Sequence, residues 1–329
     1  MFSLFFFLIL VFVIGIANNY FRIQHYSGPF AFVIDKPVNA NVTVSFGTFP
    51  PPRETTDFVV LFVLSRRDSF AIRKTIRKTW GYGNDNVYFV IGKACSVPSK
   101  YRGTDEGGNM ACKASPVPIE ERDYMEQTQK QILLARAEDE HLLQEQTSHR
   151  DLLLVDDIDI YRSLSKKLKF AYTFAMQMLP TAKWVIKIDD DFFVRVKELK
   201  DFITRNFNDS VPTLISGLIS QGKAATRGKW KEVPQYSPGK NYPPFPLGSY
   251  GHVVSRPIVE VIVQNQNGLF DYQGEDTSLG IWLNLLNSNQ VFFHQTKKMK
   301  NDGKCLDRDA LVVGHDVTTQ KMIECNKTL

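Results

Sequence analysis

The stretch Lys183–Val194 constrains the fold most strongly, because an apolar run ends there abruptly in three carboxylates. Trp184–Ile188 has the apolar and β-branched composition of a buried strand, and Asp189–Asp191 follow where that strand would end. In an open α/β sheet, ligands bind at the carboxyl ends of the strands. We therefore expect an α/β protein with a ligand site beside these aspartates.

The spacing of the aspartates suggests what that ligand is. On an extended chain Asp189 and Asp191 point the same way, so their carboxylates can share one ligand. A hard divalent cation such as Mg²⁺ or Mn²⁺ prefers carboxylate and phosphate oxygens. The same residues could instead form a solvated acidic turn or a helix cap, because Asp is common at both. The apolar residues on either side argue against a wholly solvated segment.

The N-terminus indicates the compartment and the domain organisation. Residues 1–21 carry no charge and are nearly all apolar, so they can span a bilayer as a signal anchor or serve as a cleaved signal peptide. A buried core helix is disfavoured by this extreme position. Residues 22–55 are rich in Pro, Asn, Thr and Gly, which is typical of a stem or linker. We expect one folded domain over residues 56–329.

Composition and cysteine usage fit a globular secretory protein. Hydrophobic residues make up 43% and charged residues 23%, and the net charge of +5 is spread without long basic runs, so nucleic acid is not indicated as a partner. Four cysteines suit an oxidising compartment. Proximity favours Cys95–Cys112 and Cys305–Cys325, although four cysteines allow three connectivities. Sequons at Asn41, Asn208 and Asn326 fit the same compartment.

Strand-like and helix-like segments alternate along the chain up to the three aspartates. This order predicts a largely parallel, Rossmann-like sheet flanked by helices. Neither a dinucleotide fingerprint nor a P-loop is present. The expected strands are 57–64, 87–91, 151–155 and 183–188, and the expected helices are 69–81, 119–146, 161–178 and 196–206.

The first expected helix carries two arginines that are candidates for diphosphate binding. Arg73 and Arg77 lie four residues apart, on one helix face, just after the first strand. Guanidinium groups match phosphate oxygens in a bidentate manner. The alternative is a solvated basic face of an ordinary surface helix.

Two later segments supply further candidates. Glu275 and Asp276 follow a glycine and open an apolar helix, so either could serve as a general base, or both could simply stabilise the helix N-terminus. His315 ends a short apolar strand and is a candidate metal ligand, although a lone histidine is usually structural. The aromatic residues of 230–245 suit stacking on sugars, but they would also suit ordinary ordered loops.

Together these segments resemble the β-1,3-glycosyltransferases of glycosyltransferase family 31, the galactosyltransferase family. The similarity covers residues 57–317 in the family's order. Ile76–Gly81 resembles the I-R-x-T-W-G signature, and Asp159–Lys167 the D-x-Y-x-N-L-T-x-K segment, with two serines replacing Asn and Thr. Lys187–Val194 resembles K-x-D-D-D-x-F-V, and Glu275–Gly280 the E-D-V-x-x-G block.

Two further sequence segments indicate one branch of the family. Gly228–Glu232 and Tyr272–Asp276 are similar to the branch that contains a β-1,3-N-acetylgalactosaminyltransferase and the proteoglycan-linker galactosyltransferase. The family's G-G-G-Y-V-[LI]-S block departs here, because Gly248–Ser255 has Tyr250 at a usual Gly position and His252 where Tyr is usual. This departure concerns the shape of the sugar site.

The resemblance implies a GT-A fold, a UDP-sugar donor, Mn²⁺ and inversion at the anomeric carbon. The expected product is a β-1,3 linkage to a glycan of a glycoprotein, proteoglycan or glycolipid. It further implies a single-pass type II Golgi membrane protein with a lumenal catalytic domain. The implied roles are metal ligands for Asp191, Asp189 and His315, nucleotide-sugar contacts for Asp189 and Asp190, nucleotide contacts for Arg73 and Arg77, general base for Asp276, and positioning for Glu275.

Two alternatives stay open on sequence grounds. A non-catalytic lectin-like or chaperone-like secretory protein could share the fold, and the altered Gly248–Ser255 block leaves room for it. A Mg²⁺-dependent phosphoryl-transfer enzyme would need further carboxylates or a nucleophile in a recognisable arrangement, and the sequence offers none. The aspartates and Glu275–Asp276 favour the transferase.

Overall fold

The structure is a computed structural model that describes residues 45–53, 57–105, 107–115, 120–236, 240–286 and 290–327. The expected membrane or signal segment 1–21, most of the expected stem and the Asn41 sequon lie outside these residues. In the described part of the chain, no helix is both long and apolar enough to cross a membrane.

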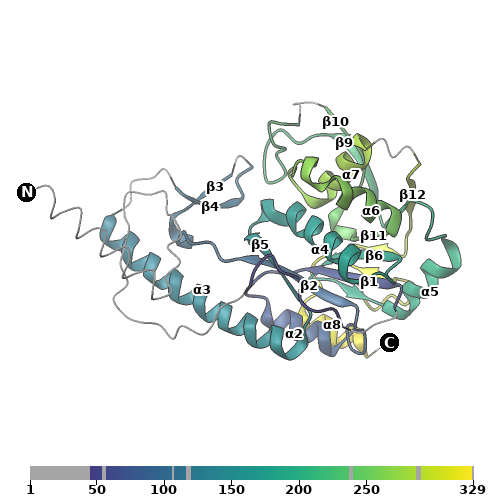
Figure 1. Cartoon of the computed structure of the whole chain (residues 1–329), viewed down its shortest axis with the longest axis horizontal. Coiled ribbons are helices and arrows are strands. Elements are labelled where there is room, and N and C mark those ends of the chain that lie inside the picture. Colours follow the sequence, from purple (N-terminus) through teal and green to yellow (C-terminus); the bar gives the residue numbers. More distant parts are fainter. Residues whose placement is uncertain are drawn as a thin grey trace, which may run out of the picture. The chain divides into compact units, whose positions relative to one another are not determined.

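A seven-stranded sheet forms the centre of the domain, in the order β12-β8-β11-β6-β1-β2-β5 (Figure 1). Only β11 runs antiparallel to its neighbours, so the predicted mixed, largely parallel α/β sheet is confirmed. The strands are β1 (Val59–Leu64), β2 (Val87–Lys93), β5 (Leu152–Ile158), β6 (Trp184–Asp189), β8 (Thr213–Ser216), β11 (His252–Ser255) and β12 (Phe292–Gln295).

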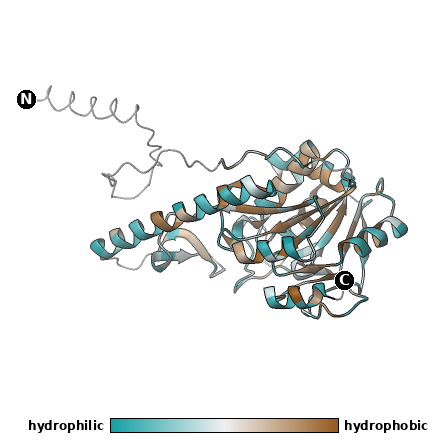
Figure 2. Cartoon of the chain, turned by 90° about the horizontal axis from the view of Figure 1, so that it is seen from below, coloured by the Kyte–Doolittle hydropathy of each residue, from teal (hydrophilic) through white to brown (hydrophobic). Residues whose placement is uncertain are grey.

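Helices cover both faces of this sheet (Figures 1 and 2). The side chains of β1 alternate between two hydrophobic cores, as expected for a strand buried on both sides. One core includes residues from α2, α3, α5 and α8, and the other is built with α4, α6 and α7. The helices are α2 (Phe70–Lys78), α3 (Glu121–His149), α4 (Leu164–Met178), α5 (Val196–Asn206), α6 (Arg256–Asn265), α7 (Glu275–Leu285) and α8 (Thr319–Asn326).

The order of the strands fixes where a ligand site can form. From β1 the sheet grows outward through β2 and β5, and the chain then returns through α4 to place β6 on the other side of β1. This reversal is a topological switch point, at which the crevice beyond the carboxyl ends of the strands binds ligands in open α/β sheets. Ser65 and Asp190 lie there, directly after β1 and β6.

Three smaller sheets surround this edge. A three-stranded sheet joins β7 (Phe193–Val194) to β14 (Val312–Val313) and β13 (Met299–Lys300), and it brings the C-terminal region to the three aspartates. An antiparallel pair is formed by β9 (Ile219–Lys223) and β10 (Asn241–Pro246), and a hairpin by β3 (Arg102–Thr104) and β4 (Met110–Ala114). The 3₁₀ turns are η1 (Ser99–Tyr101), η2 (Tyr161–Ser163), η3 (Gly248–Tyr250) and η4 (Gln266–Gly268).

Both predicted disulfides, Cys95–Cys112 and Cys305–Cys325, are present. Two differences from the sequence expectations concern the regions around the domain. The β3–β4 hairpin lies in a region where the sequence predicted neither a strand nor a helix. Residues 45–53, which fell within the expected stem, pack on the domain, where Gly47 N donates to Leu154 O (2.7 Å) and the Phe49 ring contacts Phe170.

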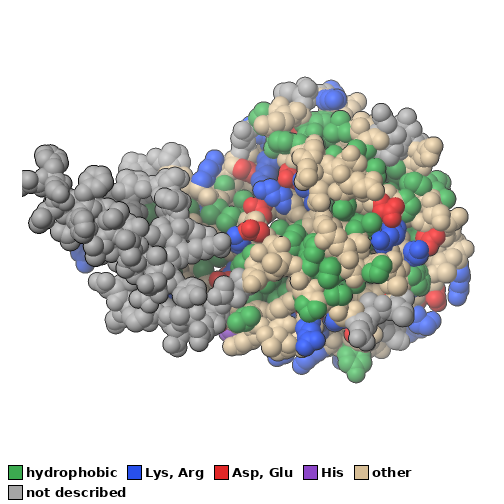
Figure 3. Space-filling view, in the orientation of Figure 1, with side chains coloured by type: hydrophobic (Ala, Val, Ile, Leu, Met, Phe, Trp, Pro, Cys, Tyr) green, Lys and Arg blue, Asp and Glu red, His purple; other side chains and the backbone are tan. Residues whose placement is uncertain are grey.

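Charge is distributed evenly on the visible surface. Basic and acidic side chains are interspersed on the face seen in Figure 3, without a large area of one sign. This agrees with the scattered basic residues of the sequence.

Candidate functional site

Asp191, His315 and Asp316 form a cluster at the carboxyl edge of the sheet. Each offers one ligand atom, and these atoms all lie within 4.8 Å of one another. His315 Nδ1 is 3.5 Å from Asp191 Oδ2, and the backbone N–H of Asp316 donates to the same oxygen (3.1 Å). Two carboxylates and one imidazole fit a divalent cation such as Mn²⁺. Asp316 was not among the predicted ligands, although it directly follows the predicted ligand His315 in the sequence.

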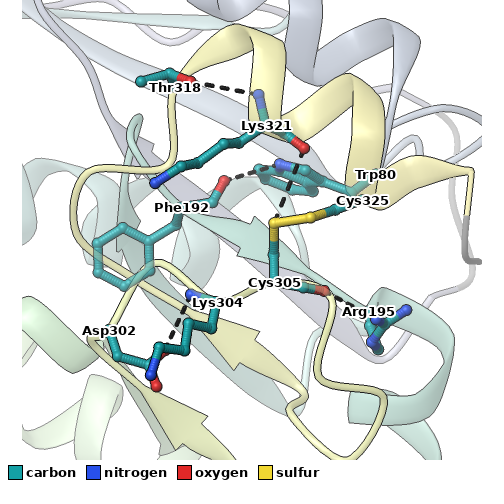
Figure 4. The surroundings of a disulfide bond; sticks show 9 residues. All are labelled: Trp80, Phe192, Arg195, Asp302, Lys304, Cys305, Thr318, Lys321 and Cys325. Carbon is teal, nitrogen blue, oxygen red and sulfur yellow. Dashed lines mark hydrogen bonds between the residues drawn. A yellow bond between two sulfur atoms is a disulfide. The ribbon is translucent and has the colours of Figure 1, made fainter.

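The packing around Phe192 positions this cluster. β14 pairs with β7, so the residues after Val313 meet the residues beside Asp191. Trp80 Nε1 donates to Phe192 O (3.0 Å), which gives the tryptophan of the I-R-x-T-W-G signature a structural role (Figure 4). The disulfide Cys305–Cys325 closes the loop that carries His315 and Asp316. The candidate metal ligands are thus held by a contact from Trp80 and by the C-terminal disulfide.

Asp189 does not join the cluster. β6 ends at Asp189 and the chain turns at Asp190 and Asp191, so the alternation of an extended strand no longer applies. The Asp189 carboxylate instead pairs with Lys187 Nζ (2.9 Å). Asp189 is therefore engaged by a lysine in this structure, and its sharing of one ligand with Asp191 stays a prediction.

Asp190 is held from the neighbouring strand. Ser65 Oγ, at the end of β1, donates to Asp190 Oδ2 (2.8 Å), and Arg73 donates to Ser65 Oγ (3.2 Å). Ser65 thus links Arg73 to Asp190 through two hydrogen bonds. Ser65 was not predicted, because only the parallel pairing of β1 with β6 brings it there.

Both candidate arginines are engaged inside the protein. Arg73 is fully buried and forms a bidentate pair with Glu145 (2.9 and 2.8 Å). Arg77 pairs with Asp151 (2.7 Å) and with Glu145 (2.7 Å). A diphosphate would have to compete with these short charge-assisted contacts. The nucleotide-binding role of both arginines stays a prediction, and the geometry favours a structural one.

Lys187 connects the acidic segment to the start of α7. Its fully buried ammonium lies 2.5 Å from Glu275 Oε1 and 2.9 Å from Asp189 Oδ1. Burial alone would lower the pKa of Lys187, but the two carboxylates outweigh it and the pKa is raised. Burial also raises the pKa of Asp189 to about 6, against the attraction of Lys187. Glu275 is thereby fixed by an ion pair, as its expected positioning role requires.

Asp276 lies next to Glu275, and among the residues that the structure describes no cationic side chain forms an ion pair with it. Its carboxylate accepts hydrogen bonds from Gly248 N (3.0 Å) and Thr277 N (2.7 Å). Burial, followed by the negative charge of Glu275, raises its pKa to about 7. A carboxylate of this pKa is a better proton acceptor near neutral pH than an ordinary aspartate. The structure thus distinguishes the neighbouring acids: Glu275 forms an ion pair with Lys187, whereas the pKa of Asp276 is raised.

The turn that departs from the family pattern joins the two halves of the site. Gly248 donates to Asp276, and a Cβ at Gly248 would lie 3.1 Å from Glu275 Oε1. A Cβ at Gly314 would lie 2.5 Å from Ser249 O, so the same turn packs against the residue before His315. The turn therefore contacts both the start of α7 and the residue that precedes His315.

The aromatic residues expected for sugar stacking separate into two groups. Tyr236, Tyr242 and Phe245 are buried in the core beside α7 and contact one another. Trp230 has 62% of its surface exposed. Of these four rings, only Trp230 is available to a ligand.

Residues 133–291 of the chain match the family model described as galactosyltransferase. Several curated β-1,3-N-acetylgalactosaminyltransferases and a β-1,3-galactosyltransferase are similar to the chain in sequence.

UDP-GalNAc:β-1,3-N-acetylgalactosaminyltransferase 2 of Xenopus laevis is 27% identical over 199 residues, covering 60% of this chain and 39% of that protein. A β-1,3-galactosyltransferase of Arabidopsis thaliana is 30% identical over 182 residues, covering 53% of this chain and 27% of that protein. A solved structure of a glycosyltransferase involved in glycosylation of the major capsid of PBCV-1 is 12% identical, covers 82% of this chain and 99% of that one, and has a TM-score of 0.35. The chain spans less than half of the length of these two curated relatives.

Proposed function

We propose that this protein transfers a hexose, galactose or an N-acetylhexosamine, from a UDP-sugar to a glycan hydroxyl in β-1,3 linkage with inversion. The observation that carries the proposal is the turn Gly248–Gly251, which holds Asp276 on one side and packs beside the Asp191–His315–Asp316 cluster on the other. An inverting transfer needs a general base and a group that stabilises the leaving diphosphate within one crevice.

The roles of the residues follow from their surroundings. Asp276 accepts the proton of the attacking hydroxyl, because a sugar hydroxyl is a poor nucleophile unless it is deprotonated during the step. Glu275, paired with Lys187, keeps its carboxylate in place beside Asp276. Asp191, His315 and Asp316 would hold Mn²⁺, which when bound neutralises charge on the leaving diphosphate. Asp190, held by Ser65, lies on the donor side of the crevice.

The relatives support the reaction class and leave the donor open. The printed names include an enzyme for UDP-GalNAc and a β-1,3-galactosyltransferase. The acceptor in this proposal is a glycan carried by a glycoprotein, proteoglycan or glycolipid. The proposed location is the Golgi membrane, with residues 1–21 as the anchor and the domain lumenal.

One assay tests the proposal directly. The full chain in detergent is incubated with Mn²⁺ and UDP-Gal, UDP-GalNAc or UDP-GlcNAc, and UDP release and sugar transfer are measured with and without glycan acceptors. We expect one donor to support transfer, Asp276→Asn to retain UDP binding while losing transfer, and Asp191→Ala to lose Mn²⁺-dependent UDP binding. No turnover with any donor, together with unchanged UDP binding in Asp191→Ala, would favour the non-catalytic alternative.

A further inference from the structure

The turn 228–231 is fixed in place although it lies on the surface. Lys231 N donates to Gly228 O (2.9 Å) and closes the turn. Asn109 Nδ2, next to the start of β4, donates to Lys229 O (2.8 Å), and Arg162 donates to Lys231 O (2.9 Å). Three separate parts of the chain thus meet at this short segment.

Glu232 ties the same turn to the candidate base. This carboxylate is buried, and it accepts hydrogen bonds from Gln273 N (2.8 Å) and from the Tyr242 hydroxyl (2.7 Å). Gln273 lies directly before Gly274, the residue that caps α7 and precedes Glu275 and Asp276. The position of the turn is therefore coupled to the start of the catalytic helix.

Trp230 stays exposed on this rigid support. Its ring and that of Tyr161 lie 5.8 and 5.0 Å from Lys229 Nζ. The side chain of Tyr161 interacts with Trp230 and Gln273. Burial, and next the negative charges of Glu275 and Asp276, raise the pKa of Tyr161. An aromatic ring that is held in a fixed orientation can stack on the apolar face of a sugar. Such preorganisation lowers the entropic cost of binding the sugar.

Three exposed cations lie close to Trp230 in the sequence. Lys223, Arg227 and Lys229 are all exposed, and in the described part of the chain none of them has a carboxylate within ion-pair distance. The nearest acid in sequence, Glu232, is buried and engaged. Exposed cations without acidic partners attract a ligand that carries its own negative charge.

We propose that Trp230 and Lys229 form an acceptor subsite for an anionic sugar, in which Trp230 stacks on the ring and Lys229 pairs with its carboxylate or sulfate. The inference rests on the proposed function, because it places the acceptor hydroxyl beside Asp276. It adds the chemical class of the acceptor, which neither the family nor the relatives specify.

The test compares matched disaccharide acceptors that differ only in charge: a neutral hexose, its uronic acid and its 6-O-sulfate. The full chain is assayed with its donor and Mn²⁺. We expect the wild type to favour at least one anionic acceptor about fivefold or more in kcat/KM, and the uronic acid and sulfate arms show which anion is used. Equal use of all three would overturn the proposal.

Two variants separate stacking from charge. Trp230→Ala should raise the acceptor KM about tenfold while the donor KM and UDP hydrolysis stay unchanged, and Trp230→Phe should restore most of the loss. Lys229→Gln should reduce the ratio between anionic and neutral acceptors about threefold. Lys197→Gln, an exposed lysine on α5, is the control. A wild-type acceptor KM in Trp230→Ala would overturn the proposal.

Binding measured without turnover keeps this inference separate from the proposed function. Saturation-transfer NMR of the full chain with the uronic acid disaccharide should give signals that fall in both Trp230→Ala and Lys229→Gln. If UDP-sugar turnover fails and these signals persist, the transferase proposal fails and the subsite stands. If turnover succeeds and the signals are the same in all variants, the subsite fails.

Discussion

Lys187 Nζ lies 2.5 Å from Glu275 Oε1, although 88 residues separate them in the sequence. The lysine belongs to β6, which leads into the three aspartates, and the glutamate opens α7, which carries the candidate base. The ion pair therefore joins the donor side of the proposed site to its acceptor side. Because Lys187 is fully buried, both acids depend on it for charge compensation.

Replacement of Lys187 should destabilise the domain strongly. Lys187→Met would leave the buried Glu275 and the partly exposed Asp189 without this cation, and removing one partner of a buried ion pair typically costs about 3–5 kcal/mol. We expect a fall in Tm of roughly 10 °C, measured by differential scanning calorimetry. Lys187→Met with Glu275→Gln should recover part of the loss, because one uncompensated carboxylate is removed. A double variant as unstable as the single one would show that the pair is not coupled.

Asp316 should contribute to metal affinity. It adds a second carboxylate to the cluster of Asp191 and His315. We expect Asp316→Asn to weaken Mn²⁺ binding about tenfold, measured by Mn²⁺ electron paramagnetic resonance with the full chain and no nucleotide. Asp309→Asn removes an exposed acid from the same C-terminal region and should leave the affinity unchanged. Equal affinities of wild type and Asp316→Asn would exclude Asp316 as a ligand.

Gly314→Ala should impair the same cluster through packing. A Cβ at this position would lie 2.4 Å from Phe192 Cε1 and 2.5 Å from Ser249 O, so the neighbouring backbone must shift. That shift would move His315 away from Asp191, and we expect Mn²⁺ affinity to fall while the fold is retained. Gly268→Ala is the matched control, because nothing lies within 4 Å of its Cβ. Unchanged Mn²⁺ affinity in Gly314→Ala would contradict this account of the packing.

Much of this site could be predicted because its signals are local. Trp184–Ile188 reads as a strand from its own composition, and the helix 196–206 was predicted with the bounds that the structure shows. Asp191, His315 and the Glu275–Asp276 pair stand at the ends of such elements. These residues follow from periodicity and from the position at which each element ends.

The parts that could not be predicted depend on contacts distant in sequence. Two arginines four residues apart suit a diphosphate as well as an internal ion pair, and the sequence did not indicate that Glu145 and Asp151 would pair with them. A turn at Asp190 and Asp191 follows β6, and local composition did not predict it. No local sequence pattern predicts ion-pair partners that are distant in the sequence.

The pH dependence of transfer should report Asp276. As general base it must be deprotonated, and its pKa is raised to about 7 by burial and by Glu275. We expect kcat/KM to fall about tenfold per unit as the pH decreases below about 7, and to level off above it. Glu275→Gln should move the inflection to lower pH, because it removes the neighbouring negative charge. A flat profile between pH 5.5 and 8, measured with saturating metal, would exclude Asp276 as the base.

His252 should make the stability of the domain sensitive to acid. It is fully buried, its Nε2 lies 3.1 Å from the Tyr172 hydroxyl, and its Nδ1 has no hydrogen-bond partner among the described residues. Burial, and next the nearby charge of Lys187, lower its pKa well below the usual value. The unfolded chain therefore binds a proton at this histidine below its pKa of about 6.5, whereas the folded protein does not. Because of this difference, the free energy of unfolding decreases as the pH falls.

His252→Gln isolates this effect, because the amide can keep a hydrogen bond to Tyr172 without titrating. The raised pKa values of Asp189 and Asp276 act in the opposite direction, but both acids are present in the two proteins and cancel in the difference. We expect the wild type to lose up to about 1.4 kcal/mol per pH unit relative to His252→Gln below pH 6.5, measured by urea unfolding of the full chain. Parallel pH profiles of the two proteins would show that His252 accepts a proton in the folded state as readily as in the unfolded one.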